Sequence, residues 1–160
     1  MSISIITKKA FSVIGISGEG DAANAVEWIQ PLWAQAFEKR HEIQHRVKPE
    51  AWGLMSGCES FLSPWQEAGK YLAGWETTVE TIDALGWDTW HVPDQCFATV
   101  KCTLGNYRET LELLVHTISR DQRYCQSGAI HEYYPAIFNN SDTDHLYLHM
   151  MIKEAAPRQG

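Results

Sequence analysis

Hydrophobic and polar positions change their spacing along the chain, and these changes divide its first half into predicted strands and a predicted helix. Residues 11–16 (FSVIGI) are apolar and β-branched and are followed by two nearby glycines, which predicts a strand. From Ala22 to about Arg40 the apolar positions recur at helical spacing, so we predict a helix that contains Pro31. The rest of this half is predicted to form two strands, residues 52–56 and 71–79, and an irregular segment, residues 80–94.

The same order of patterns begins again in the second half. Residues 97–103 alternate as a strand does, and a helical stripe runs from about Tyr107 to Asp121. Two further strands are predicted at residues 129–134 and 145–152. The chain therefore contains two predicted β-α-β-β pseudo-repeats, about 9–80 and 95–154, in an α+β fold. We expect one antiparallel sheet with both helices on one face and a groove where the halves meet.

The composition and net charge of the chain exclude some classes of function. The 160 residues suit one domain (1–160), and 13 basic against 20 acidic side chains give a net charge of −7. This acidic balance argues against binding to a nucleic-acid backbone, which requires a basic face. No apolar run approaches the ~20 residues that cross a bilayer, and the four cysteines form no C-x-x-C pair. We expect a cytoplasmic protein with reduced thiols and no membrane association.

Seven tryptophans, all before residue 91, are the unusual part of the composition. Tryptophan is large and seldom fully buried, so this number indicates either a rich core or a cavity lined with aromatic rings. The sequence has no G-x-S-x-G motif and no glycine loop with P-loop or dinucleotide-binding spacing. No catalytic residue and no cofactor is therefore predicted.

One short motif points toward metal chemistry. His41, Glu42 and His45 match H-E-x-x-H, in which two histidines on one helix face bind zinc and the glutamate acts as a base. The motif lies at the end of the predicted helix, before Arg46 and Lys48, and these cations oppose a bound dication. No residue stands out as a third ligand. A zinc metallopeptidase is therefore the least favoured alternative, and no metal site is predicted.

Glu132 stands out chemically in the strand predicted at residues 129–134. Strand alternation places Ile130, Glu132 and Tyr134 on one face. A carboxylate on an inward face is costly unless a cation compensates it, and neighbouring aromatic rings add a cation–π attraction of about 0.5–2 kcal/mol each. The alternative is a face turned to water, and the strand pattern alone leaves both interpretations open.

Several of these stretches, taken in order, resemble the GyrI-like small-molecule-binding family, which forms effector-binding domains of MerR- and AraC-type multidrug regulators. The matching parts are residues 71–76 (YLAGWE), 97–102 (FATVKC), 105–109 (GNYRE), 131–134 (HEYY) and 146–150 (LYLHM). The resemblance covers about residues 9–154. It implies a duplicated β-α-β-β fold with a curved antiparallel sheet around a central pocket. Too few residues flank the pseudo-repeats for a DNA-binding domain, which favours a stand-alone module similar to members encoded on integron gene cassettes.

The resemblance also implies positions for the ligand-binding residues. The pocket glutamate of cation-binding members falls on Glu132, and aromatic pocket positions fall on Tyr107, Tyr134 and Tyr147. Strand parity in the first half and the long connection after it add four candidates: Trp52, Tyr71, Trp75 and Trp90. The remaining tryptophans are two helix residues expected in the core, Trp28 and Trp33, and two without an assignment, Trp65 and Trp87.

These observations favour a binding module for amphipathic cationic small molecules, in which Glu132 neutralises the charge and aromatic rings enclose the apolar body. A second hypothesis is a hydrolase of the same fold that uses Glu132 with Tyr134 or Tyr107 for acid–base chemistry. A third is an interaction protein that senses a ligand for a separately encoded DNA-binding protein. A homodimer is a further open alternative, because sheet edges and several tryptophans need covering.

Overall fold

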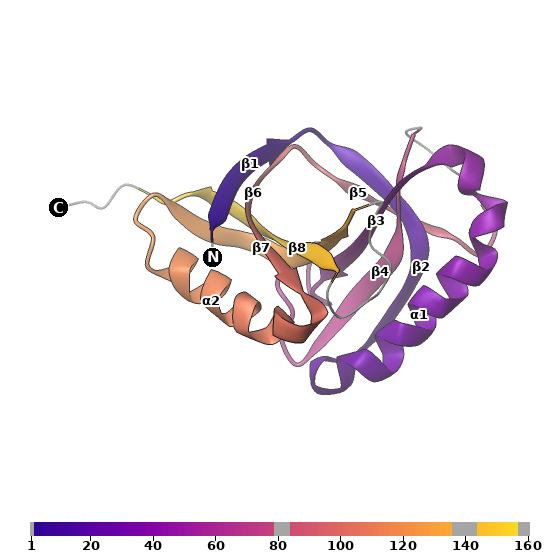
Figure 1. Cartoon of the computed structure of the whole chain (residues 1–160), viewed down its shortest axis with the longest axis horizontal. Helices are drawn as coiled ribbons and strands as arrows, with labels where there is room; N and C mark the ends of the chain where they lie inside the picture. The colour runs from indigo at the N-terminus through magenta and orange to yellow at the C-terminus, as the bar shows by residue number, and fades with distance from the viewer. Residues whose placement is uncertain (1, 79–83, 136–143, 157–160) are drawn as a thin grey trace.

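The described residues of the chain fold into one curled antiparallel sheet that carries two helices (Figure 1). The computed structural model describes residues 2–78, 84–135 and 144–156, so residues 79–83 of the predicted strand and irregular segment lie outside it. The helices are α1 (Ala25–Lys39) and α2 (Tyr107–Ser119), with the 3-10 turns η1 (Ala22–Asn24), η2 (Arg40–Glu42), η3 (Gln44–Arg46) and η4 (Leu104–Asn106). The strands are β1 (Ile3–Lys8), β2 (Phe11–Asp21), β3 (Val47–Ser56), β4 (Ala68–Thr77), β5 (Asp88–Val92), β6 (Gln95–Thr103), β7 (Tyr124–Tyr134) and β8 (His145–Glu154). In this described part, neither helix combines the length and the apolar character that a membrane span requires.

The order of the strands across the sheet shows the predicted duplication. Neighbours run β1-β6-β8-β7-β3-β4-β2-β5, and the paired strands are antiparallel. The units β2-α1-β3-β4 and β6-α2-β7-β8 repeat one order of elements, so the predicted α+β fold is confirmed. The halves meet where β3 pairs with β7, and Gly53 lies opposite Glu132 at this junction.

Two edge strands are not visible in the sequence pattern. β5 lies inside the segment predicted to be irregular, so that prediction is wrong for residues 88–92. This strand is only five residues long and mixed in polarity, so it carries little periodicity, and its pairing with β2 fixes it. β1 was not predicted either, and it pairs with β6, with Ile3 opposite Val100.

Short links join these edge strands to the rest of the sheet. β1 continues into β2 through residues 9–10, and β5 continues into β6 through residues 93–94. The Ala10 amide donates a hydrogen bond to Asp94 Oδ1 at 2.7 Å, which ties the two links together. Two continuous segments, β1-β2 and β5-β6, therefore cross from one half of the sheet to the other and form the arch at the top of Figure 1.

The curled sheet has two faces with different surroundings. On its outer face, α1 packs on a buried cluster that includes Ile14 and Trp75, and α2 packs on one that includes Leu148. On its inner face, side chains from strands that are not neighbours meet, as when the rings of Trp52 in β3 and His149 in β8 lie 5.2 Å apart. Each fully buried apolar side chain contributes about 1.5–3 kcal/mol, so both faces stabilise the fold.

Candidate ligand-binding site

A pocket of about 710 Å³ lies between the two helices and the outer face of the sheet. Both halves of the chain line it: α1 supplies Ile29 and Trp33, and α2 supplies Tyr107 and Leu111. The strands and the loop before β4 supply Met55, Pro64, Trp65, Tyr71, Gln126, Ala129, Ile130, Glu132 and Tyr134. The groove that the repeat predicts at the junction of the halves is therefore present as this pocket.

Glu132 brings a carboxylate into the wall of the pocket. It lies in β7, opposite Gly53 of β3 and Leu148 of β8, and only 9% of its surface is exposed. Strand alternation turns it to the same face as Ile130 and Tyr134, which also line the pocket. Because a buried charge is costly without compensation, the groups around this carboxylate decide what the pocket can bind.

Three tyrosine hydroxyls hold the carboxylate. Tyr71 donates to Glu132 Oε1 at 2.5 Å, and Tyr134 donates to the same oxygen at 2.9 Å. Tyr107 donates to Oε2 at 2.5 Å. Trp33 Nε1 in turn donates to the Tyr71 oxygen at 2.9 Å. The network therefore connects α1, β4, β7 and α2 through one glutamate.

The tyrosines act in this network as hydrogen-bond donors. Burial raises the pKa of Tyr71, Tyr107 and Tyr134 well above the usual tyrosine value, and the charge of Glu132 raises these pKa values further. All three hydroxyls therefore keep their protons at neutral pH, so each of them can donate to the carboxylate.

Glu132 differs in its charge partners from Glu76, which is also buried. On the inner face, Glu76 is paired with Lys8 at 2.9 Å and with Lys48 at 2.6 Å. In the described residues, no lysine, arginine or histidine forms an ion pair with Glu132. The pocket thus contains a carboxylate that is stabilised by neutral donors and, among the residues that the structure describes, has no cationic partner.

The structure brings four of the eight predicted site residues together around the pocket. They are Glu132, Tyr71, Tyr107 and Tyr134. Trp75 also lies on the outer face, but it is only 2% exposed and is buried under α1. Its ring meets that of Trp33 edge-on, with the ring centroids 6.3 Å apart. Trp75 therefore packs against α1 instead of lining the pocket, and Trp33 of that helix lines the pocket.

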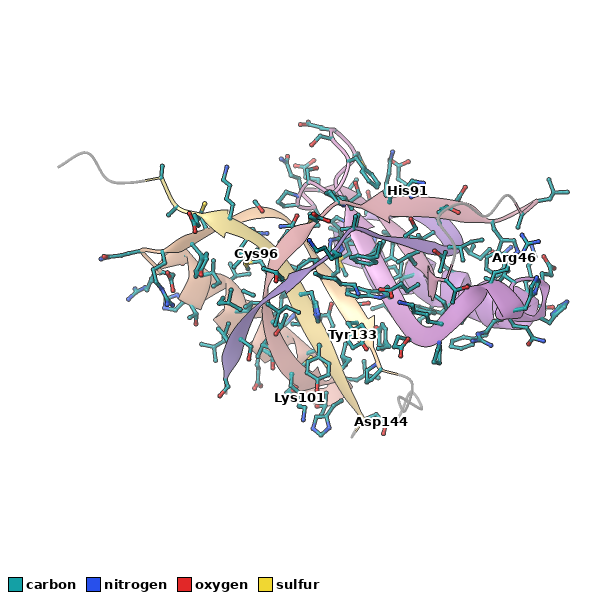
Figure 2. All side chains as sticks on the ribbon, turned by 90° about the horizontal axis from the view of Figure 1, so that it is seen from above. Arg46, His91, Cys96, Lys101, Tyr133 and Asp144 are labelled. Carbon is teal, nitrogen blue, oxygen red and sulfur yellow. The ribbon has the colours of Figure 1, made fainter. Side chains whose placement is uncertain are left out.

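The other predicted residues lie on the inner face of the sheet: Trp52, Trp90 and Tyr147. Tyr147 and Trp52 both lie opposite Tyr133, whereas Leu148 lies opposite Glu132. Because successive residues of a strand point to opposite faces, this register turns Tyr147 and Trp52 away from the pocket. Figure 2 views the molecule from above, with α2 behind the strands, and labels Tyr133.

Sequence reasoning missed most of the first half's contribution to the pocket. Trp33 falls on the apolar stripe of a helix and was expected in the core, yet it lines the pocket and donates to Tyr71. Trp65, which the pattern leaves unassigned, lines the pocket from the loop before β4 and stacks on Trp28 at 5.5 Å between ring centroids. A helical stripe has the same spacing whether it faces a core or a cavity, so the sequence carries no signal that separates the two.

The H-E-x-x-H segment does not form the helical arrangement that its zinc-binding form requires. α1 ends before the motif, and His41 and His45 lie in the separate turns η2 and η3. Glu42 accepts a hydrogen bond from Trp87 Nε1 at 3.0 Å. Within the described ranges, no three His, Cys, Asp or Glu side chains gather as metal ligands. The segment is therefore explained by local structure and by its contact with Trp87.

The family model described as the GyrI-like small molecule binding domain matches residues 1–153. The chain belongs to the GyrI-like family. No curated protein matches it. The family description is that of a binding domain, so this GyrI-like chain is a small-molecule-binding module.

Solved structures share the fold of the GyrI-like chain. SAV2435, in a structure bound to tetraphenylphosphonium, has 13% identity and a TM-score of 0.72 over 96% of this chain and 94% of its own. The C-terminal domain of EcmrR has 10% identity and a TM-score of 0.66 over 96% and 98%. An integron cassette protein from the mobile metagenome of Vibrio cholerae has 14% identity and a TM-score of 0.59 over 94% and 95%. At these identities the likeness shows a common fold.

Proposed function

We propose that this GyrI-like domain binds amphipathic cations and that Glu132 receives their positive charge. The observation that carries the proposal is a buried carboxylate in the wall of a largely apolar pocket, without a cationic partner among the described side chains. A cation in the pocket supplies the Coulomb attraction that Lys8 and Lys48 supply to Glu76. A neutral ligand of the same shape gains only the apolar contacts.

The rest of the pocket suits the apolar, aromatic body of such a ligand. Trp33, Trp65 and Tyr71 bring rings to the wall, and Ile29 and Leu111 add aliphatic surface. Ring faces attract a cation within about 6 Å by ~0.5–2 kcal/mol. SAV2435, which shares the fold, is described in complex with tetraphenylphosphonium, an amphipathic cation of this kind. The size of the pocket, its lining and the charge of Glu132 therefore support the same ligand class.

Titration with tetraphenylphosphonium, followed by calorimetry and tryptophan fluorescence, tests the proposal. We expect Glu132→Gln to weaken binding at least about tenfold, because a hydrogen-bonded charged group contributes about 1.5–3 kcal/mol. Glu112→Gln removes an exposed carboxylate from α2 and is the matched control, with unchanged affinity expected. Equal affinities of folded Glu132→Gln and wild-type protein, with folding checked by thermal unfolding, would contradict the proposal.

A further inference from the structure

The carboxylate of Glu132 has few acceptor positions left for a ligand. An ionised carboxylate offers about four lone-pair positions. Tyr71 and Tyr134 use two of them on Oε1, and Tyr107 uses one on Oε2. The main chain of Gly53 packs beside Oε1, since a Cβ at this residue would lie only 2.6 Å from that oxygen. About one position, on Oε2, remains open to a donor from the ligand.

The three hydroxyl donors are themselves held in place. Tyr71 is fully buried, and its oxygen accepts from Trp33 Nε1 at 2.9 Å. Tyr107 is the first residue of α2, immediately after a capping box that begins at Thr103. The ring of Tyr134 packs edge-on against Trp33, with 5.5 Å between the ring centroids. A ligand therefore meets a carboxylate whose hydrogen bonds are fixed before it arrives.

A protonated primary amine would bring three N–H donors into this pocket, and each of them needs an acceptor. The open position on Glu132 accepts one. The pocket wall is otherwise mainly apolar, as at Ile29 and Leu111, and its amide side chains, Gln30 and Gln126, belong to exposed residues. An ammonium ion must therefore turn its other N–H groups to the tyrosine oxygens, which are neutral and weaker acceptors, leave them unpaired, or displace a hydroxyl from the carboxylate. Each of these recovers less than the hydration that the ion leaves in water.

A quaternary ammonium or phosphonium ion carries the same charge without any N–H group. It gains the Coulomb attraction of the carboxylate and requires no acceptor. We propose that Glu132, with three of its about four acceptor positions occupied by tyrosines, selects cations that lack N–H groups over protonated amines of the same skeleton. This inference rests on the proposed function, because it concerns the same pocket and the same charge. It gives the tyrosines a role in ligand selection in addition to the support of Glu132.

Two cations with one skeleton test this selection. They are (biphenyl-4-ylmethyl)trimethylammonium and (biphenyl-4-ylmethyl)ammonium, and calorimetry at pH 7 gives the ratio of their dissociation constants. In the wild type we expect the quaternary ion to bind at least about tenfold more tightly. Its methyl groups add apolar contact, so the decisive comparison is the ratio in different proteins. Tyr107→Phe frees a position on Oε2, and we expect the preference to fall at least about fivefold.

The controls separate this inference from the proposed function. Tyr124→Phe removes a hydroxyl outside the pocket and should leave the preference unchanged. Tyr134→Phe frees a position on Oε1, should also lower the preference, and keeps the test intact if Tyr107→Phe does not fold. An unchanged preference in the folded pocket variants overturns the selection and leaves the proposed function standing. If Glu132→Gln also binds the quaternary ion as tightly as the wild type, the proposed function fails.

Discussion

Gly53 is the residue that allows Tyr71 and Glu132 to meet. It lies opposite Glu132 where the two halves of the sheet join. A Cβ at this residue would collide with the Tyr71 hydroxyl and would lie 2.6 Å from Glu132 Oε1, closer than the 3.0 Å below which real Cβ atoms are essentially never found. Glycine is therefore required here by the close approach of side chains from β4 and β7 to the main chain.

Replacement of Gly53 by alanine adds only one methyl group, but it should disturb the pocket strongly. We expect Gly53→Ala to weaken tetraphenylphosphonium binding about tenfold and to lower the free energy of unfolding by about 1–3 kcal/mol, as overpacking does. Gly18→Ala, whose Cβ would meet only the flexible Leu32 side chain at 3.0 Å, is the control for affinity. Calorimetry and urea unfolding measure both quantities, and wild-type affinity in Gly53→Ala would contradict this account.

The residues of the site also show how far strand parity can be used. Parity within the strand correctly groups Glu132 with Tyr134, because alternation needs only one strand. It does not tell which face of another strand lies under the helices, so parity predicts a pocket position for Trp52, whose side chain lies on the inner face. Tyr147, for which the family resemblance implies a pocket position, lies on the inner face as well. That choice depends on the register between strands, which distant parts of the chain set together.

At the scale of elements, the start of α2 places Tyr107. The Asn106 amide donates to Thr103 Oγ1 at 3.3 Å, and the Thr103 amide donates to Asn106 Oδ1 at 2.8 Å. This reciprocal capping box fixes the turn immediately before the helix. The hydroxyl that reaches Glu132 Oε2 therefore starts from a backbone position that two side chains define.

Loss of this cap should lower the stability of the folded protein. We expect Thr103→Ala to lower the free energy of unfolding by about 1 kcal/mol, because it removes the side-chain acceptor of the capping box. For a chain of this size, that change corresponds to a fall in melting temperature of about 2–4 °C. Thr103→Ser keeps the hydroxyl and should retain most of the stability. A melting temperature of Thr103→Ala equal to that of wild type would show that the cap contributes nothing.

The elements that the sequence predicts well are those with long periodic stretches. Both helices and the central strands have enough residues to show a period, whereas β1 and β5 depend on their partners β6 and β2. β3 begins at Val47, before the predicted strand 52–56, although Pro49 follows. The register with β4 shifts between Val47 and Ala51, and such an irregularity tolerates a proline that cannot donate to a ladder hydrogen bond.

At the scale of the whole molecule, the inner face contains a buried histidine pair. His131 and His149 lie opposite each other on β7 and β8 and are 0% and 6% exposed. Burial lowers the pKa of His131 to about 3, helped by the neighbouring His149, and burial lowers the pKa of His149 to about 4, helped by the charge of Lys8. His131 Nδ1 also accepts from the Met55 amide at 3.0 Å, which requires an unprotonated nitrogen.

This pair predicts a loss of stability in mild acid. In the unfolded chain both histidines bind protons below about pH 6.5, whereas in the folded chain they resist protonation down to about pH 3–4. The unfolded state therefore binds more protons in this window, and the free energy of unfolding falls as the pH is lowered through it. The slope approaches about 1.4 kcal/mol per pH unit for each histidine.

Urea unfolding between pH 5 and pH 7.5 measures this slope. His149→Phe, which keeps an aromatic ring beside Trp52 and Tyr133, should reduce the slope by roughly half, because one titrating group remains. A flat stability profile in the wild type, or an unchanged slope in this variant, would contradict the assignment.

The homodimer, the separately encoded DNA-binding partner and the cytoplasmic location stay predictions, because each of them depends on partners or surroundings outside this chain.

The pairing of β1 with β6 also determines when this part of the sheet can form during synthesis of the chain. Ile3 leaves the ribosome well before its partner Val100, which follows only after the rest of the first half and the start of the second. Contacts between such distant positions close large loops, which slows folding relative to local contacts. The growing chain therefore carries β1 without its sheet partner until the second half arrives. The repeat looks modular in sequence, yet β1, which precedes the first unit, pairs with β6 of the second.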